Sequence, residues 1–323
     1  MFDTPILFLI FNRPDTTALV FEQIKGVKPK HLFIAADGPR DNRPGEDDLC
    51  KASRDIVLQG IDWECEVKTL FREVNLGCGV APAKAINWFF DNVDQGIILE
   101  DDCLPDPSFF TYCELLLEKY KYDDRVLTIG GTNLGYTLQN GNSYEYSRFM
   151  NMWGWASWKR SAKIIDYSLL NWKKIYFKKL FLISRTHTGN SIDINWINYW
   201  QNYFDIVSSG NLDCWDYQWV FSQLLHRKIS IFPAKNLIKN IGFTHNATHT
   251  VYPNHPIAHL LLQSLSFPLH HPKHTFIDKD YEEEFIKKIW CGQIRVSIFK
   301  IVKTKLLYIP LVTKLNRFIK KRV

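Results

Sequence analysis

Short apolar runs alternate with longer segments of helical periodicity through the first 130 residues, and this alternation restricts the fold more than any other feature. The apolar runs cover residues 6–11, 31–36, 65–71, 96–99 and 126–131, and each has the length of a buried strand. Strands separated by helices of about 10–15 residues indicate βαβ units. We therefore expect an α/β fold with a mostly parallel central sheet and helices on both faces.

The second half of the chain has a less regular pattern. A turn-rich stretch and the Trp-rich "WGWASW" are followed by "INWINYWQNYFDIVSSG" and "CWDYQWVFSQLLHRK", which predict two helices, and by the strand-like "ISIFPAKNLI". The sequence contains no repeat and no low-complexity linker. We expect one domain over residues 1–284, built from a first half (1–130) and a second half (131–284), with a separate tail over residues 285–323.

This C-terminal tail carries the excess positive charge of the chain. The net charge is +6, yet residues 1–284 hold 29 Lys and Arg against 34 Asp and Glu, a charge of −5. Eleven Lys and Arg follow from Lys287 to Arg322 and alternate with Ile, Leu, Val and Phe. A basic amphipathic stretch of this kind suits an anionic membrane surface. A helical tail packed on the body and a nucleic-acid arm are the alternatives, and we expect no nucleic-acid partner.

Cysteine usage and hydropathy predict where the protein works. Seven cysteines without regular spacing or a CxxC pair are typical of a reduced intracellular protein. "PILFLIF" is too short for a signal peptide and lacks a basic leader, and no apolar run reaches the about 18 residues of a membrane span. We expect a cytoplasmic protein, with the tail as a peripheral attachment to the inner face of the cell membrane.

The stretch "GIILEDDCLPDPS" places three carboxylates at the end of a predicted strand. Asp106 and Pro107 suffice to begin the following helix, because Asp is a good N-cap and Pro is favoured at the first helical position. Glu100, Asp101 and Asp102 therefore have no capping role. Carboxylate oxygens are hard ligands suited to Mn²⁺ or Mg²⁺, whose other ligands are often substrate phosphates. The triplet predicts a site for a metal ion and an anionic ligand.

Polar motifs follow the other predicted strands as well. They are Asn12-Arg13, Asp37-Gly38 and the turn "NLGCG" at residues 75–79. Parallel strands bring their carboxyl ends to one edge of a sheet, where ligands bind in open α/β folds. We expect these motifs to converge with the acidic triplet on one site.

Several common motifs are excluded. "NLGCGVA" contains only GxG, with Pro82 where a dinucleotide-binding turn has its third glycine, and the chain has no GKS or GKT. "HNATH" has the spacing of HExxH but lacks the glutamate, so a zinc protease is not expected.

The residues above resemble those of the GT-A glycosyltransferases, in which an acidic motif at the end of a central strand binds Mn²⁺ and the nucleotide-sugar diphosphate. "ILEDD" is similar to the EDD form of N-acetylglucosaminyltransferase I. The order "FNRPD", "AADGPR", "NLGCG", "EDDCLPDPSFF", "WGWASW", "CWDYQW" is similar to a group of bacterial sugar transferases, over about residues 4–250. The resemblance implies a GT-A fold, with the nucleotide-sugar bound by residues 1–130 and the acceptor by residues 131–284.

The resemblance also implies roles for the first motifs. Asn12 and Arg13 would contact the nucleotide, and Asp37 would accept the N3–H of the base. The alternative for Asp37 is a plain turn formed with Gly38. Lys84 would reach the diphosphate or else lie on a solvated helix face.

For the triplet, the resemblance makes Asp102 the direct ligand of Mn²⁺ or Mg²⁺. It places Glu100 and Asp101 against the sugar and the ribose. A nucleotide-diphosphate sugar, most simply a UDP-sugar, would be the donor.

In the second half, "CWDYQW" resembles a segment whose aspartate removes the proton of the acceptor hydroxyl. This makes Asp216 the catalytic base of an inverting transfer, with an N-cap role as its alternative. Trp155 of "WGWASW" would lie under the sugar or acceptor. His245 and His249 would close over the diphosphate or else be surface residues of a turn.

The acceptor implied is a hydroxyl of a bacterial glycan or of a lipid-linked saccharide in polysaccharide biosynthesis. The animal relative has an N-terminal membrane anchor that we do not find here, which sets the two apart in location. Two other functions stay open. One is a nucleotidyltransferase that makes nucleotide-sugars, which would need a Gly-rich basic loop after the first strand. The other is a carbohydrate-binding or scaffold protein without catalysis.

Overall fold

A computed structural model describes residues 1–187, 192–243, 256–286 and 289 of the chain. His245, His249 and nearly all of the basic tail at residues 285–323 lie outside these residues, so their roles stay predictions. No helix among the described residues is long and apolar enough to cross a membrane.

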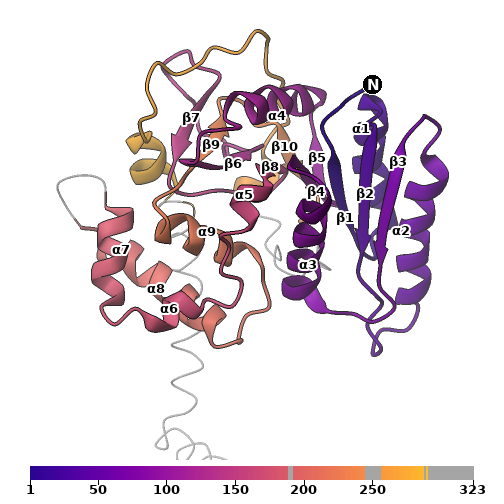
Figure 1. Cartoon of the computed structure of the whole chain (residues 1–323), viewed down its shortest axis with the longest axis horizontal. Helices are drawn as coiled ribbons and strands as arrows, with labels where there is room; N and C mark the ends of the chain where they lie inside the picture. The colour runs from indigo at the N-terminus through magenta and orange to yellow at the C-terminus, as the bar shows by residue number, and fades with distance from the viewer. Residues whose placement is uncertain (188–191, 244–255, 287–288, 290–323) are drawn as a thin grey trace, which may run out of the picture.

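The first half forms the parallel part of the sheet (Figure 1). Strands β1 (Ile6–Ile10), β2 (His31–Ala36), β3 (Glu66–Phe71) and β4 (Gln95–Glu100) pair in the order β3-β2-β1-β4. All three pairings are parallel. β1 is buried along its whole length because it lies between two neighbours with helices on both faces, which explains its continuous apolar run.

Four helices follow these strands: α1 (Pro14–Val27), α2 (Glu46–Gly60), α3 (Gly77–Asn92) and α4 (Pro107–Lys119). Alternate side chains of β1 point to opposite faces of the sheet, where they pack against different helices. Ile6, Phe8 and Ile10 pack in a core with α1, α2 and α4. Leu7 and Leu9 pack in a second core with α3 and the helices of the second half.

The second half extends the same sheet. β8 (Trp155–Trp158) lies antiparallel between β4 and β6 (Val126–Gly130), and β9 (Ile229–Pro233) runs parallel to β6. β7 (Tyr144–Ser147) forms the outer edge, giving eight strands in the order β3-β2-β1-β4-β8-β6-β9-β7. The predicted fold class, a mostly parallel α/β sheet with helices on both faces, is confirmed.

A small two-stranded sheet joins the two halves near the end of β4. β5 (Cys103–Pro105) pairs antiparallel with β10 (Ile238–Asn240), so Asn240 lies opposite Cys103. This pairing brings the chain after residue 240 to the acidic triplet. The remaining described helices are α5 (Lys159–Ala162), α6 (Leu170–Lys174), α7 (Lys178–Thr186), α8 (Ile194–Ser208), α9 (Asp216–Leu225), the 3₁₀ helix η1 (Pro256–His259) and the π-helix η2 (Tyr281–Ile286).

The helix starts test two capping predictions. Asp106 caps α4 as predicted, since its carboxylate accepts a hydrogen bond from the backbone N–H of Ser108 at 2.9 Å. In α1 the N-cap position is occupied by Arg13, and Asp15 lies in the first turn, where its negative charge interacts favourably with the helix dipole. The N-cap of α9 is Trp215, so Asp216 is the first residue of this helix and not its cap.

Candidate functional site

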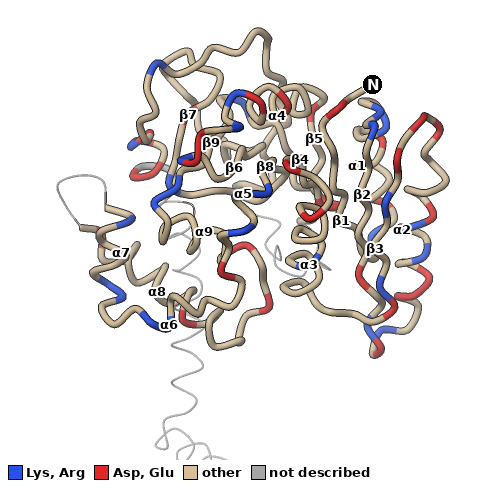
Figure 2. The backbone as a smooth tube through the Cα atoms, viewed as in Figure 1, with Lys and Arg blue, Asp and Glu red and all other residues tan. Residues whose placement is uncertain are grey.

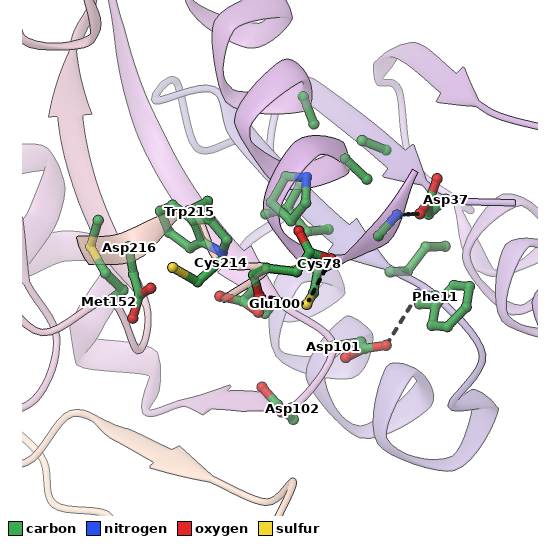
Figure 3. A pocket seen from close by; sticks show the side chains of 18 of the residues that line it. Phe11, Asp37, Cys78, Glu100, Asp101, Asp102, Met152, Cys214, Trp215 and Asp216 are labelled. Carbon is green, nitrogen blue, oxygen red and sulfur yellow. Dashed lines mark hydrogen bonds between the residues drawn. The ribbon is translucent and has the colours of Figure 1, made fainter. Parts of the chain in front are cut away.

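A cleft of about 680 Å³ opens at the carboxyl ends of β1 to β4, between the turn that starts α3 and the segment that leads into α9. Figure 3 shows Glu100 between Asp216 on one side and Asp101 and Asp37 on the other. The sequence-predicted site residues that line the cleft are Arg13, Asp37, Glu100, Asp101, Asp102 and Asp216. The predicted convergence of the strand-end motifs is therefore observed.

Three other predicted residues do not line the cleft. Asn12 donates a hydrogen bond from Nδ2 to Oε1 of Glu46 at 2.7 Å, which connects the loop after β1 to the start of α2. Lys84 lies exposed on α3. Trp155 is fully buried and stacks on Trp215, with ring centroids 5.9 Å apart. Their predicted ligand contacts stay predictions.

Arg13 and the acidic triplet form one electrostatic unit. The guanidinium of Arg13 makes an ion pair with Asp101 and donates from Nη1 to Oδ2 of Asp102 at 2.8 Å. Asp101 also accepts a hydrogen bond from the backbone N–H of Phe11 at 3.1 Å. One cation thus faces three carboxylates, so negative charge remains in excess at the end of β4.

This excess changes the protonation of the triplet. Burial raises the pKa of Glu100 well above its ordinary value, and the charges of Asp102 and Asp101 raise it further. Asp216 adds to this rise across the cleft. Burial likewise raises the pKa of Asp101 to about 6, against the lowering effect of Arg13. The cleft therefore favours any ligand that supplies positive charge.

We predict that Glu100→Gln stabilises the metal-free protein at neutral pH. A carboxyl with a higher pKa in the folded state contributes stability below its unfolded value, here about 4.5, and loses it as the pH rises through the folded value. The midpoint of thermal unfolding should therefore rise at pH 7 and change little at pH 4. Exposed Glu118→Gln is the control, and an equal shift of the midpoint at both pH values would contradict the prediction.

Two carboxylates cap the start of α3 and hold the "NLGCG" turn. Asp37 accepts hydrogen bonds from the backbone N–H groups of Leu76 (2.9 Å) and Gly77 (3.1 Å). Asp213, from the other wall of the cleft, accepts one from Gly79 at 2.9 Å. Burial raises the pKa of Asp37 although these N–H groups oppose the rise. The turn is thus fixed to both halves of the domain.

The two glycines of this turn leave room for Asp213. A Cβ on Gly77 would lie 2.3 Å from Oδ2 of Asp213, and a Cβ on Gly79 would lie 2.3 Å from Oδ1. Gly77 also has a φ of +83°, which side chains other than glycine rarely adopt.

We predict that Gly77→Ala lowers the free energy of unfolding by about 1–3 kcal/mol, because it adds backbone strain and displaces Asp213. Gly45→Ala is the matched control, since Gly45 has a φ of +80° and nothing within 4 Å of its added Cβ. Denaturant unfolding of both variants separates the two effects. Equal losses would mean that the contact with Asp213 contributes nothing.

The opposite wall of the cleft is aromatic around Asp216. Trp153, Tyr203, Trp215 and Tyr217 line it. The rings of Tyr203 and Tyr217 stack with centroids 4.8 Å apart. Such surfaces offer broad apolar faces with polar edges, which suit the faces of sugar rings.

The carboxylates at the end of β4 fit the ligand preference of a hard divalent ion. Asp102 provides oxygen donors at the cleft, and the triplet holds more negative charge than Arg13 balances. Gly242 lies against this carboxylate, since a Cβ there would be 2.2 Å from Oδ2 of Asp102. Among the described residues, no three His, Cys, Asp or Glu side chains form a closed metal site.

Sequence reasoning missed several residues that line the cleft. Arg40 and Arg72 line it close to Asp37, and Asp213 and Trp153 come from the second half. Arg40 is held by Glu46, which is only 4% exposed. Arg40 and Arg72 could have been noted because each lies a few residues from a predicted strand end. Asp213 gave no local signal because its partners are 134 or more residues away.

The sequence matches no known family model and no curated protein. Solved structures with some similarity include the inositol-1-phosphate CTP transferase of T. maritima, at 11% identity and a TM-score of 0.31 over 53% of this chain and 74% of that one. Mouse xyloside xylosyltransferase 1 in its apo form has 8% identity and a TM-score of 0.35, over 70% of this chain and 82% of that one. A UDP-glucose pyrophosphorylase complexed with UDP-glucose has 10% identity and a TM-score of 0.31, over 72% of this chain and 90% of that one. No single reaction is common to these names.

Proposed function

We propose that the chain is a metal-dependent glycosyltransferase of the GT-A type that inverts the anomeric centre of the transferred sugar. One observation carries the proposal: carboxylates face the same cleft from two sides. The group at the end of β4 suits a cation and a diphosphate, and Asp216 on the other side suits a hydroxyl. A volume of about 680 Å³ is in the range of sites for small ligands.

The donor would be a nucleotide-diphosphate sugar, most simply a UDP-sugar, bound between the α3 turn and the triplet. Asp37 would accept the N3–H of the base, since two backbone N–H groups leave part of its acceptor capacity free. Arg72 lines the cleft, close enough to Asp37 for the two charges to interact, and would offer its charge to the diphosphate. Arg13 would balance whichever of Asp101 and Asp102 the ligand leaves unpaired.

Asp102, together with phosphate oxygens of the donor, would hold Mn²⁺ or Mg²⁺. Such an ion stabilises the negative charge on the departing diphosphate. Glu100 and Asp101 would face the sugar and the ribose. Because the pKa of Glu100 is raised, this side chain can donate a hydrogen bond to a sugar hydroxyl when protonated.

Asp216 would act as the catalytic base toward the acceptor. Its carboxylate takes the proton of an acceptor hydroxyl while the hydroxyl oxygen forms a bond to the anomeric carbon. The bond from that carbon to the diphosphate oxygen breaks, and the nucleotide diphosphate leaves. A single displacement inverts the anomeric centre. The aromatic wall would hold the acceptor, which we propose to be a glycan or a lipid-linked saccharide of bacterial polysaccharide biosynthesis on the cytoplasmic side of the membrane.

The proposal is tested by nucleotide binding and by product analysis. Calorimetry with UDP should give binding that depends on Mn²⁺ and disappears with EDTA. A panel of nucleotide-sugars with Mn²⁺ should then show slow release of the nucleotide diphosphate from one of them. Absence of nucleotide binding would leave a carbohydrate-binding or scaffold protein. Release of pyrophosphate from a nucleoside triphosphate and a sugar phosphate would identify a nucleotidyltransferase.

A further inference from the structure

A group of basic and apolar side chains is exposed on α6, on the start of α7 and on the loop between these helices. We call it the α6–α7 surface and define it as Leu170, Lys173, Lys174, Tyr176, Phe177, Lys179 and Leu180. Its apolar members are unusually exposed: Tyr176 by 89%, Phe177 by 66% and Leu180 by 62%. Single exposed apolar residues are common, but several large ones close together usually mark an interaction site.

Contacts within the described part of the protein do not bury these side chains. Tyr176 and Phe177 contact each other edge to face, with ring centroids 4.8 Å apart, while Ile175 and Phe181 on either side pack against the core. The chain thus buries one set of apolar residues and presents another to solvent within a few positions.

The exposed residues stand on a fixed base. Trp172 of α6 is fully buried, and its Nε1 donates to Oδ1 of Asp205 on α8 at 2.9 Å. Nζ of Lys178 donates to the same oxygen at 2.6 Å. Both short helices are therefore tied to α8, so their exposed side chains keep a defined arrangement.

The charged residues within this segment are all basic, and the acid that precedes it, Asp166, accepts hydrogen bonds from the backbone N–H groups of Leu170 and Asn171. Residues 167–192 contain five Lys and Arg and no Asp or Glu. Lys173, Lys174 and Lys179 are exposed and form no ion pair with other described residues. The body of the protein is acidic overall, so this concentration of cations beside aromatic rings is local.

The α6–α7 surface lies on the same side of the molecule as the carboxyl ends of the strands. α6 and the start of α7 lie toward the lower edge of Figure 1, the edge at which β1, β2 and β3 end. Residues that follow these strands, such as Asp37 and Arg72, line the cleft. Figure 2 shows blue Lys and Arg segments along the tube there.

We propose that the α6–α7 surface docks on a lipid bilayer that contains anionic phospholipids. Tyr and Phe rings with neighbouring apolar side chains enter the interfacial region of a bilayer, and the lysines contact the acidic headgroups. This docking would keep the cleft near lipid-linked molecules. It is independent of the basic tail and of the proposed transfer reaction, because it rests on described residues outside the cleft.

The test is co-sedimentation of the full chain with vesicles of phosphatidylcholine, with and without phosphatidylglycerol, in the absence of nucleotide-sugar. The double variant Tyr176→Ser/Phe177→Ser should lower the partition coefficient for the anionic vesicles by at least about 10-fold. The triple variant Lys173→Gln/Lys174→Gln/Lys179→Gln should lower it by roughly fivefold for each lysine, and binding by all forms should weaken with salt.

Tyr122→Ser/Lys121→Gln is the matched control, because Tyr122 is also 89% exposed and lies beside Lys121. This variant should bind as the natural chain does, and circular dichroism verifies that all variants fold. Unchanged vesicle binding by the α6–α7 variants would overturn the proposal and assign membrane binding to the tail. The oligomeric state of each form is measured by size-exclusion chromatography. If the α6–α7 variants lose self-association that the natural chain shows, and still bind vesicles, the surface is an interface with a second copy and the proposal is overturned. Neither result bears on nucleotide binding in the cleft.

Discussion

Asp216→Asn is expected to bind the nucleotide-sugar normally and to transfer the sugar about 10²–10⁴-fold more slowly. Asn has the same shape as Asp but cannot take a proton from the acceptor hydroxyl. Asp216 lies across the cleft from the triplet, so its replacement should leave the metal and diphosphate region intact. The measurements are calorimetric affinity for the nucleotide with Mn²⁺ and the rate of transfer or hydrolysis.

Asp15→Asn serves as the control for this variant. Asp15 is an exposed acid in the first turn of α1, as Asp216 is an acid in the first turn of α9, but it does not line the cleft. Loss of the favourable interaction with the helix dipole is therefore common to both variants. Near-normal transfer by Asp216→Asn would remove this residue from the mechanism. A loss of nucleotide binding equal to the loss of rate would make it a binding residue.

Asp102→Ala should lose the part of nucleotide binding that depends on Mn²⁺. Mutation of a residue that only orients a metal ligand weakens metal binding by about 10–100-fold. Removal of the ligand itself should therefore weaken binding at least as much. The protein should remain folded, because the change removes one of three repelling carboxylates and leaves Arg13 paired with Asp101. Titration of UDP with Mn²⁺ and with EDTA measures the effect, and equal affinities of the natural chain and the variant would disprove the assignment.

A second variant tests the same site without removing a charge. Gly242→Ala places a Cβ where the Asp102 carboxylate now lies, so the carboxylate must move. We expect weaker Mn²⁺-dependent binding of UDP with little change in binding without the metal. Gly26→Ala is the control, since its Cβ has nothing within 4 Å. An unchanged affinity in Gly242→Ala would mean that the position of Asp102 does not matter.

The central strands could be predicted because both of their faces are buried. β1 and β4 lie inside the sheet, so they read as continuous apolar runs with turn residues at their ends. The parallel arrangement then placed the motifs after each strand at one edge, and this is why Arg13, Asp37 and the triplet were found. The start of α4 was also predictable, because Asp106 and Pro107 act locally.

Other elements depend on partners that are distant in the sequence. β8 has four residues and exists because β4 and β6 flank it, so "WGWASW" gave no sign of a strand. Trp155 in β8 is buried in the core, whereas Trp153, which precedes this strand, lines the cleft. The ion pairs of Arg13 arise only when β1 and β4 pair side by side in the sheet. The hydrogen bond from Gly79 to Asp213 arises only when the two halves pack.

The contact of Asp213 with the α3 turn has an evolutionary consequence. Gly77, Gly79 and Asp213 occupy one volume, so a side chain at either glycine position requires a smaller residue at position 213. Among relatives of this chain the three positions should therefore change together. A protein with two larger residues in the turn would need another acceptor for the N–H group of residue 79, which Asp213 satisfies here. The identity of a residue near the proposed acceptor site is in this way tied to a turn on the donor side.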